Sequence, residues 1–191
     1  MRRHLLALLM PLMLLALPFS ATWAQPIAPT EAAQLSDEAA AAWAALEASA
    51  WIREGEPDAE RVIYVFTDPY CPYCHRLWQA TRPWVEAGKV QMRHVMVGLM
   101  ARDSPRTAIS LLAEENPSEA LLAHLRGETT PRLETLPRAL EEALLDNHLL
   151  MESFGAMATP SLIYHVDELE MAHGLPDEQE LERIMGSALQ E

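Results

Sequence analysis

The sequence Cys71-Pro72-Tyr73-Cys74 constrains this chain more than any other feature. It contains the only two cysteines among the 191 residues, and it closely follows the apolar run at residues 62–66. Cysteines two residues apart are typical of a reversible redox pair, and the junction between a strand and a helix can make such a pair reactive. The motif therefore predicts a redox-active cysteine pair at a strand-to-helix junction.

The N-terminus has the pattern of an export signal. Arg2 and Arg3 form a basic start, residues 5–17 are apolar, and the small residues Thr22 and Ala24 occupy the two positions that a signal peptidase reads. The apolar run is shorter than the roughly 20 residues that a membrane-spanning helix needs. We therefore expect export with cleavage after Ala24, and no stable association with the membrane.

A structural disulfide is the alternative for the cysteine pair, because two cysteines in a small exported protein usually form a stabilising bridge. A bridge between Cys71 and Cys74 would close a very small loop, so it would remove little entropy from the unfolded chain. The spacing therefore favours a redox role over a structural one.

The composition is acidic, with a net charge of −14. An acidic surface argues against nucleic acid and anionic membranes as partners. The length that remains after a cleaved signal suits one domain with its own core.

The hydrophobic pattern around the cysteines predicts a βαβ unit. Residues 61–67 have the pattern of a buried strand, residues 72–87 that of a helix, and residues 90–97 that of a second strand. Gly88 and Gly98 follow the helix and the second strand, where each would end. The cysteine pair thus falls at the end of the first strand of a compact α/β unit.

The rest of the chain adds helices and two more strands. A helix is expected before the βαβ unit and several short helices after it, followed by two strands and a final helix. The ranges are 36–53, 104–151, 161–166, 169–172 and 176–189.

This order of elements, with the cysteine pair after the first strand, predicts an α/β chain with a thioredoxin-like fold and a helical insertion. We expect residues 1–24 to be the signal peptide and residues 25–57 to be a lead with a linker-like helix. Residues 58–191 would form the thioredoxin-like domain, with the insertion at about 100–155.

Position gives the two cysteines different chemistry. Pro72 suits the first turn of a helix, where its missing N–H is not needed, and this places Cys71 at the N-cap. Unpaired backbone N–H groups and the helix dipole then favour a thiolate, and such sites lower a cysteine pKa from about 8.5 to roughly 3.5–7.5. Cys71 is therefore the expected attacking group, and Cys74 the thiol that resolves the mixed disulfide.

Thr159-Pro160 is the second candidate element of the site. It precedes the third strand of the domain, and an X-Pro bond is where a cis peptide costs little. In thioredoxin-like folds this proline is cis and faces the cysteines, which leaves the backbone before it free to bind an extended substrate. Pro72 and Tyr73 are the other residues expected to contact the substrate. An ordinary proline at the start of a strand is the alternative.

Separated stretches of the sequence carry a family resemblance: residues 51–55, 62–74, 82–91, 155–160 and 174–177. They resemble the catalytic domain of the DsbC/DsbG family of periplasmic thiol-disulfide interchange proteins, over about residues 43–189. The Pro-Tyr interior of the cysteine motif and the threonine before Pro160 are more similar to the DsbG branch.

The resemblance implies a periplasmic protein that a membrane thiol reductase of the DsbD type keeps reduced. Such proteins isomerise wrong disulfides or reduce sulfenic acids on cysteine-containing exported proteins. On transfer, Cys71 is the nucleophile, Cys74 the resolving thiol, and Thr159 and Pro160 the loop that faces the substrate. Asp68 and Tyr70 match or border positions near the cleft.

Family members carry a dimerisation domain before the linker helix, whereas only residues 25–35 lie between the signal and the expected helix. We therefore expect a monomer. A monomer would be open to oxidation, so a DsbA-like disulfide oxidase is the alternative to a disulfide reductase, isomerase or sulfenic-acid reductase.

Other classes compete for the same residues. Cys71-x-x-Cys74-His75 also fits the attachment pattern of c-type haem, and Cys-Pro-Tyr-Cys occurs in glutaredoxins, which are short and cytosolic. A binding module with incidental cysteines is the non-enzymatic alternative. His75 could lower the pKa of Cys71 through its partial charge, or could be a solvated helix residue.

We expect no cofactor beyond the cysteine pair, and no metal site. The histidines that follow the expected signal peptide have no tight ligand spacing. These are His75, His94, His124, His148, His165 and His173.

Overall fold

A mixed five-stranded sheet organises the chain in the computed structural model, which describes residues 36–188. The strands run in the order β1-β3-β2-β4-β5, and only β2 and β3 are parallel neighbours. Their bounds are β1 Trp51–Glu54, β2 Arg61–Thr67, β3 Val90–Met96, β4 Ser161–His165 and β5 Leu169–His173.

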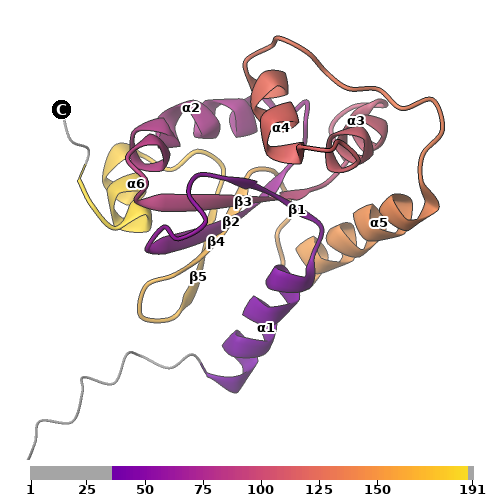
Figure 1. Ribbon diagram of the computed structural model, residues 1–191. Coiled ribbons are helices and arrows are strands. Elements are labelled where there is room, and N and C mark those ends of the chain that lie inside the picture. Colours follow the sequence, from indigo (N-terminus) through magenta and orange to yellow (C-terminus); the bar gives the residue numbers. More distant parts are fainter. Residues whose placement is uncertain (1–35, 189–191) are drawn as a thin grey trace, which may run out of the picture. The chain divides into compact units, whose positions relative to one another are not determined.

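Six helices accompany the sheet in this part of the chain: α1 Asp37–Ala48, α2 Pro72–Glu86, α3 Ser104–Leu112, α4 Pro117–Leu125, α5 Arg138–Ser153 and α6 Glu178–Met185. Three of them, α3 to α5, come between β3 and β4 (Figure 1). The predicted βαβ unit, helical insertion and ββα ending are thus confirmed. The expected signal peptide and its cleavage after Ala24 lie outside the described residues, and the boundary expected at residue 57 stays a prediction.

Alternation along the strands sends side chains into a separate core on each face of the sheet. Ile63 and Val65 of β2 pack with Trp84 of α2 and Ile184 of α6 in one core. Tyr64 and Phe66, which point the other way, pack with Leu46 of α1 and Met151 of α5. A third cluster joins Ile52 and Met96 to the helices of the insertion.

Helix α1 is shorter than predicted, since the expected helix at residues 36–53 ends at Ala48 and strand β1 follows. Both backbone groups of Ala50 bond the side chain of Asn147 on α5, and β1 then pairs antiparallel with β3. The apolar spacing at Trp51 and Ile52 fits a helix as well as a strand. Contacts with distant residues decide between helix and strand, so residues 51–54 form an edge strand and not part of a linker helix.

The final helix is also shorter than the predicted range 176–189. Asp177 caps its start by accepting a hydrogen bond from the N–H of Glu180, and Gly186 ends it in the left-handed conformation at φ 79°. An aspartate at the N-cap and a left-handed glycine after the last turn are the usual residues at the two ends of a helix.

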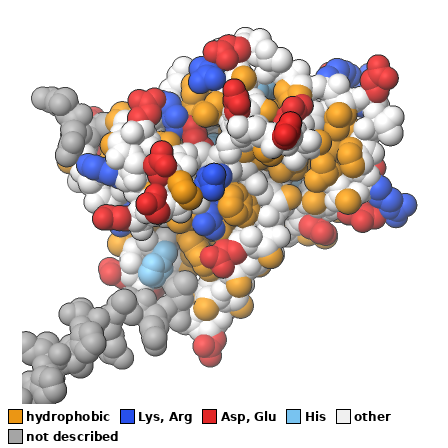
Figure 2. Space-filling view, in the orientation of Figure 1, with side chains coloured by type: hydrophobic (Ala, Val, Ile, Leu, Met, Phe, Trp, Pro, Cys, Tyr) orange, Lys and Arg blue, Asp and Glu red, His pale blue; other side chains and the backbone are white. Residues whose placement is uncertain are grey.

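No helix among residues 36–188 is both long enough and apolar enough to cross a membrane. On the face shown in Figure 2, Lys and Arg side chains lie singly or in small groups among Asp and Glu side chains. Acidic residues outnumber basic ones by 28 to 14 in the whole sequence, so the surface carries a net negative charge.

A buried carboxylate joins strands β1 and β3 to helix α2. Glu54 accepts a hydrogen bond from Trp78 Nε1 (2.9 Å) and forms an ion pair with Arg82 (2.5 Å), both on α2. Its other oxygen lies 3.0 Å from Nε2 of His94 on β3, and Nδ1 of His94 lies 3.0 Å from the hydroxyl of Thr67 at the end of β2. Burial alone would raise the pKa of Glu54, but the hydrogen bond from His94 and the charges of His94 and Arg82 outweigh it and lower the pKa.

Replacing Glu54 by Gln should lower the free energy of unfolding by about 3 kcal/mol at neutral pH, because the charged partners lose their carboxylate. The pKa of Glu54 is lower in the folded than in the unfolded chain, so its contribution is present above the ordinary value of 4.5 and is lost as the pH falls through the folded value. Urea denaturation from pH 7 to pH 3 should therefore show a smaller acid-induced loss in the variant.

Glu142→Gln is the matched control, because Glu142 pairs with Arg138 on the exposed side of α5. It should change the free energy of unfolding by less than about 0.5 kcal/mol. Equal losses in the two variants would contradict the role given to the Glu54 network.

Candidate active site

The cysteine pair lies where β2 passes into α2, as the sequence predicts. Cys71 is the N-cap of α2, with φ −77° and ψ 116°, and Pro72 follows in the first turn. The N–H of Cys74 points at the Cys71 sulfur from 3.4 Å. Both sulfurs lie in buried residues, at 3% exposure for Cys71 and 5% for Cys74, whereas Pro72 and Tyr73 between them are exposed.

The loop before β4 approaches the cysteines from the other side. The Thr159–Pro160 bond is cis, as expected from the sequence, and the thiol of Cys71 donates a hydrogen bond to the carbonyl of Thr159 at 3.2 Å. Pairing of Ser161 on β4 with Phe66 on β2 brings this loop beside the end of β2. The two predicted site elements, 88 residues apart in sequence, therefore meet in the structure.

The two thiols have opposite acidities. A hydrogen bond from the Cys74 thiol lowers the pKa of Cys71 to about 5, against the opposing effect of burial and with help from Thr159 and the N–H groups of Cys74 and Tyr73. The same hydrogen bond, burial and the negative charge on Cys71 all raise the pKa of Cys74. The site thus holds one thiolate and one thiol near neutral pH.

Thr159 contributes more than its carbonyl. Its hydroxyl is buried and forms no hydrogen bond, yet it lies close enough to lower the pKa of Cys71. The carbonyl accepts from Cys71 only while that thiol is protonated. When Cys71 ionises, its sulfur keeps the N–H of Cys74 as a donor, and the carbonyl of Thr159 is freed for another partner.

Asp68 anchors the turn between β2 and Cys71. One of its carboxylate oxygens accepts the N–H groups of Leu99 (2.6 Å) and Met100 (2.9 Å), and the other accepts from Tyr70 N–H (2.8 Å) and the hydroxyl of Ser104 (2.9 Å). The sequence indicates only that Asp68 lies near the cleft. Its anchoring role is not visible there because three of the four donors come from the segment after β3, more than 30 residues away.

His75 is held by the helical insertion. Its Nε2 lies 2.8 Å from the carbonyl of Leu125 at the end of α4, and its ring packs against Trp78 at 5.5 Å. Because a carbonyl only accepts, Nε2 carries the proton. That nitrogen is therefore engaged, which argues against the haem attachment hypothesis, while pKa tuning of Cys71 by His75 stays a prediction.

Exposed apolar side chains surround the cysteine pair. Six of the eight large hydrophobic residues that are exposed among the described residues lie in the first turn of α2, in the turn before it, or on the segments that bond Asp68 or flank Pro160. They are Tyr70, Tyr73, Leu99, Met100, Met157 and Leu175. An apolar rim of this kind is typical of a surface that contacts another protein.

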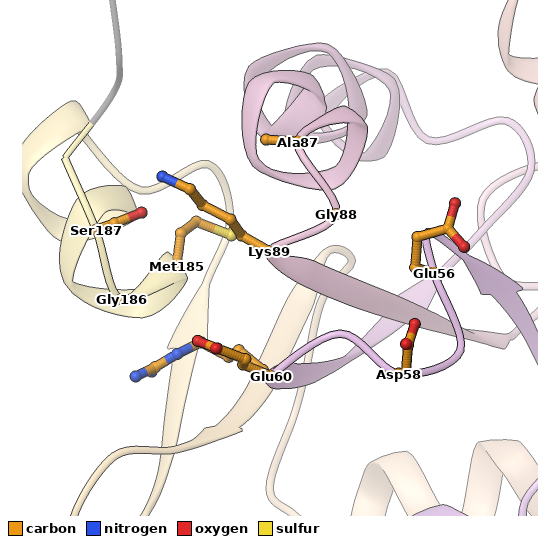
Figure 3. Close-up of a pocket in the computed structure, with 10 residues that line it drawn as sticks. Glu56, Asp58, Glu60, Ala87, Gly88, Lys89, Met185, Gly186 and Ser187 are labelled. Carbon is orange, nitrogen blue, oxygen red and sulfur yellow. The ribbon is translucent and has the colours of Figure 1, made fainter.

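A hollow of about 710 Å³ lies at the other end of the sheet (Figure 3). It is lined by Arg61 and Lys89, where β2 and β3 begin, by Glu56, and by Gly186 and Ser187 after α6. It contains neither cysteine. Within residues 36–188, no group of three or more His, Cys, Asp or Glu side chains is placed to hold a metal ion.

The fold and the position of the cysteines together define a thioredoxin-like protein with a Cys-x-x-Cys motif at the start of α2. The chain is a homologue of the thiol:disulfide interchange protein DsbG. It is 44% identical to DsbG of Pseudomonas aeruginosa over 149 residues and 39% identical to DsbG of Escherichia coli over 150 residues. These matches cover 75% and 76% of this chain but only 58% and 60% of the relatives. No protein-family model matches.

Solved structures share the fold. The catalytic domain of Proteus mirabilis ScsC matches with a TM-score of 0.65 at 24% identity, over 80% of this chain and 97% of that domain. A periplasmic thioredoxin-like protein from Salmonella enterica serovar Typhimurium matches with a TM-score of 0.65 at 22% identity, over the same shares of the two chains. The predicted thioredoxin-like fold is therefore confirmed.

The reduced protein should show one thiol that ionises near pH 5, measured by thiolate absorbance at 240 nm. Replacing Cys71 by Ser should abolish this transition, and replacing Cys74 by Ala should shift it upward because the thiol that donates to Cys71 is lost. The pKa of Cys71 is lower in the folded than in the unfolded chain, so ionisation stabilises the reduced native protein increasingly from about pH 5 towards pH 9 and not at lower pH. Retention of the transition in Cys71→Ser would contradict this assignment.

Proposed function

We propose that this protein is an exported thiol-disulfide oxidoreductase in which Cys71 attacks and Cys74 resolves. The observation that carries the proposal is the position of Cys71 at the N-cap of α2, where the N–H and the thiol of Cys74 lower its pKa while the pKa of Cys74 is raised. A thiolate is the nucleophile in disulfide exchange, and a neighbouring thiol held in its neutral form cannot compete with it.

The reaction runs in two exchanges. The Cys71 thiolate attacks one sulfur of a client disulfide, the other client sulfur leaves as a thiolate, and a mixed disulfide forms. Cys71 then carries no negative charge, so one of the causes that raise the pKa of Cys74 is gone. Cys74 loses its proton and attacks the Cys71 sulfur, which releases the second client thiolate and transfers two electrons to the client.

A client oxidised to sulfenic acid would react at the same site. Cys71 attacks the sulfenic sulfur, the hydroxyl leaves as water once it is protonated, and Cys74 resolves the mixed disulfide as before. Both reactions leave a Cys71–Cys74 disulfide, which a membrane thiol reductase of the DsbD type would reduce again.

The surroundings of Cys71 support an extended client segment as the substrate. The carbonyl of Thr159 is free to accept a hydrogen bond from a client N–H once Cys71 is ionised. The cis bond to Pro160 follows directly after this carbonyl. Exposed Tyr70, Tyr73 and Met157 offer apolar contacts beside the pair. The proposed clients are exported proteins that contain cysteines. We propose that the protein acts on them in the periplasm as a monomer.

The alternative is a disulfide oxidase of the DsbA type, and the low pKa of Cys71 is the observation in its favour. Stabilising the thiolate stabilises the reduced pair, which makes the disulfide a stronger oxidant. A pKa of about 5 falls between the values of about 7 for thioredoxin and 3.5 for DsbA. The sequence similarity to DsbG favours reductase or isomerase activity, which is therefore the first proposal.

Trapping tests the roles of the cysteines. Cys74→Ala, expressed with its export signal, should accumulate mixed disulfides with exported proteins that dithiothreitol releases, because nothing resolves them. Cys71→Ser should accumulate none, although it keeps one cysteine. Complexes that form through Cys74 alone would contradict the proposed roles.

The direction of electron flow has a separate test. Acid quenching and alkylation of the cell should find the wild-type pair mainly reduced, and loss of the membrane thiol reductase should shift it to the disulfide. A pair that is mainly oxidised in wild-type cells would favour the oxidase alternative over the proposed reductase.

A further inference from the structure

Two consecutive residues at the end of α4 contact both sides of the cysteine motif. Nε2 of His124 lies 2.8 Å from the carbonyl of Pro69, two residues before Cys71. The carbonyl of Leu125 lies 2.8 Å from Nε2 of His75, the residue after Cys74. The helical insertion therefore contacts the chain just before and just after the motif.

The contact with Pro69 places a proton on Nε2 of His124. The carbonyl of Pro69 only accepts, so Nε2 of His124 must carry a proton. Its other ring nitrogen, Nδ1, lies 2.7 Å from the hydroxyl of Thr130. The ring also meets Tyr70 edge-on at 5.9 Å, and the hydroxyl of Tyr70 lies 3.0 Å from that of Thr107 on α3. Two hydrogen bonds and a ring contact thus hold this histidine in one orientation.

The segment that His124 holds is the turn that leads into the nucleophile. The N–H of Cys71 donates to the carbonyl of Asp68 (3.1 Å), and the N–H of Tyr70 donates to the Asp68 carboxylate (2.8 Å). Pro69 is the residue between these anchors, and it has no N–H of its own. Its carbonyl is thus the group through which the insertion can fix the middle of the turn.

We propose that His124 is a positioning residue for the redox pair, which holds Cys71 at the N-cap of α2 by donating a hydrogen bond to the Pro69 carbonyl. Leu125 supplies the matching contact after the motif through His75. The inference rests on the proposed redox function, but it does not depend on the direction of electron flow. It makes the helical insertion part of the active site.

Variants of His124 test the proposal on the reduced protein. His124→Phe keeps a ring of similar size but removes the donor, whereas His124→Gln keeps an N–H donor near the position of Nε2. Loss of the donor should raise the pKa of Cys71 by about half a unit to one unit, because the turn no longer keeps the sulfur on the helix N-terminus. His124→Gln should stay within about 0.2 units of the parent.

His165→Phe is the matched control, because His165 ends β4 away from the loop at Pro160 and its Nε2 makes no hydrogen bond. The readouts are the thiolate titration at 240 nm and the equilibrium reduction potential against glutathione. The control should have the same pKa of Cys71 and the same potential as the parent protein. A folded His124→Phe variant with the parent pKa and potential would overturn the proposal, even if the client trapping succeeds. Failure of the trapping with the shift present would instead count against the proposed function.

If His124→Phe does not fold, His75→Phe and His75→Gln test the second contact of the insertion, between His75 and the carbonyl of Leu125. The Phe variant should raise the pKa of Cys71 in the same direction, and the Gln variant should restore it. Equal pKa values in the parent and in a folded His75→Phe variant would overturn the proposal.

Discussion

The contact between the Cys71 sulfur and the first turn of α2 is the interaction on which the account depends. The N-cap position gives the sulfur the N–H of Cys74, and the adjacent thiol gives it a second donor. The same contact keeps Cys74 protonated until Cys71 is consumed in a mixed disulfide. One local geometry therefore sets which sulfur attacks and when the other one follows.

That geometry is supported from distant parts of the chain. The carboxylate of Asp68 ties the turn before Cys71 to the segment after β3, and His124 reaches the same turn from α4. The loop at Thr159 closes the opposite side. The buried pair of Glu54 and His94 joins α2 to the sheet below it, so the helix that carries the cysteines is fixed along its length as well as at its start.

The parts of this site that depend on neighbours along the chain can be predicted from the sequence. The capping position of Cys71, the first-turn proline and the order of strands follow from local patterns, and the cis bond before Pro160 followed from the fold that those patterns indicate. Strand β1 was mistaken for helix, because its apolar spacing suits both and only its pairing with β3 decides. His124 was seen only as a histidine without ligand spacing, since no local pattern shows that it meets Pro69, 55 residues earlier in the chain.

Limited alkylation of the reduced protein tests the central claim most directly. With less than one equivalent of iodoacetamide at pH 6, peptide mapping should find the label on Cys71 and almost none on Cys74, because only Cys71 is a thiolate there. Labelling of both cysteines to similar extents, or of Cys74 alone, would contradict the account of the site.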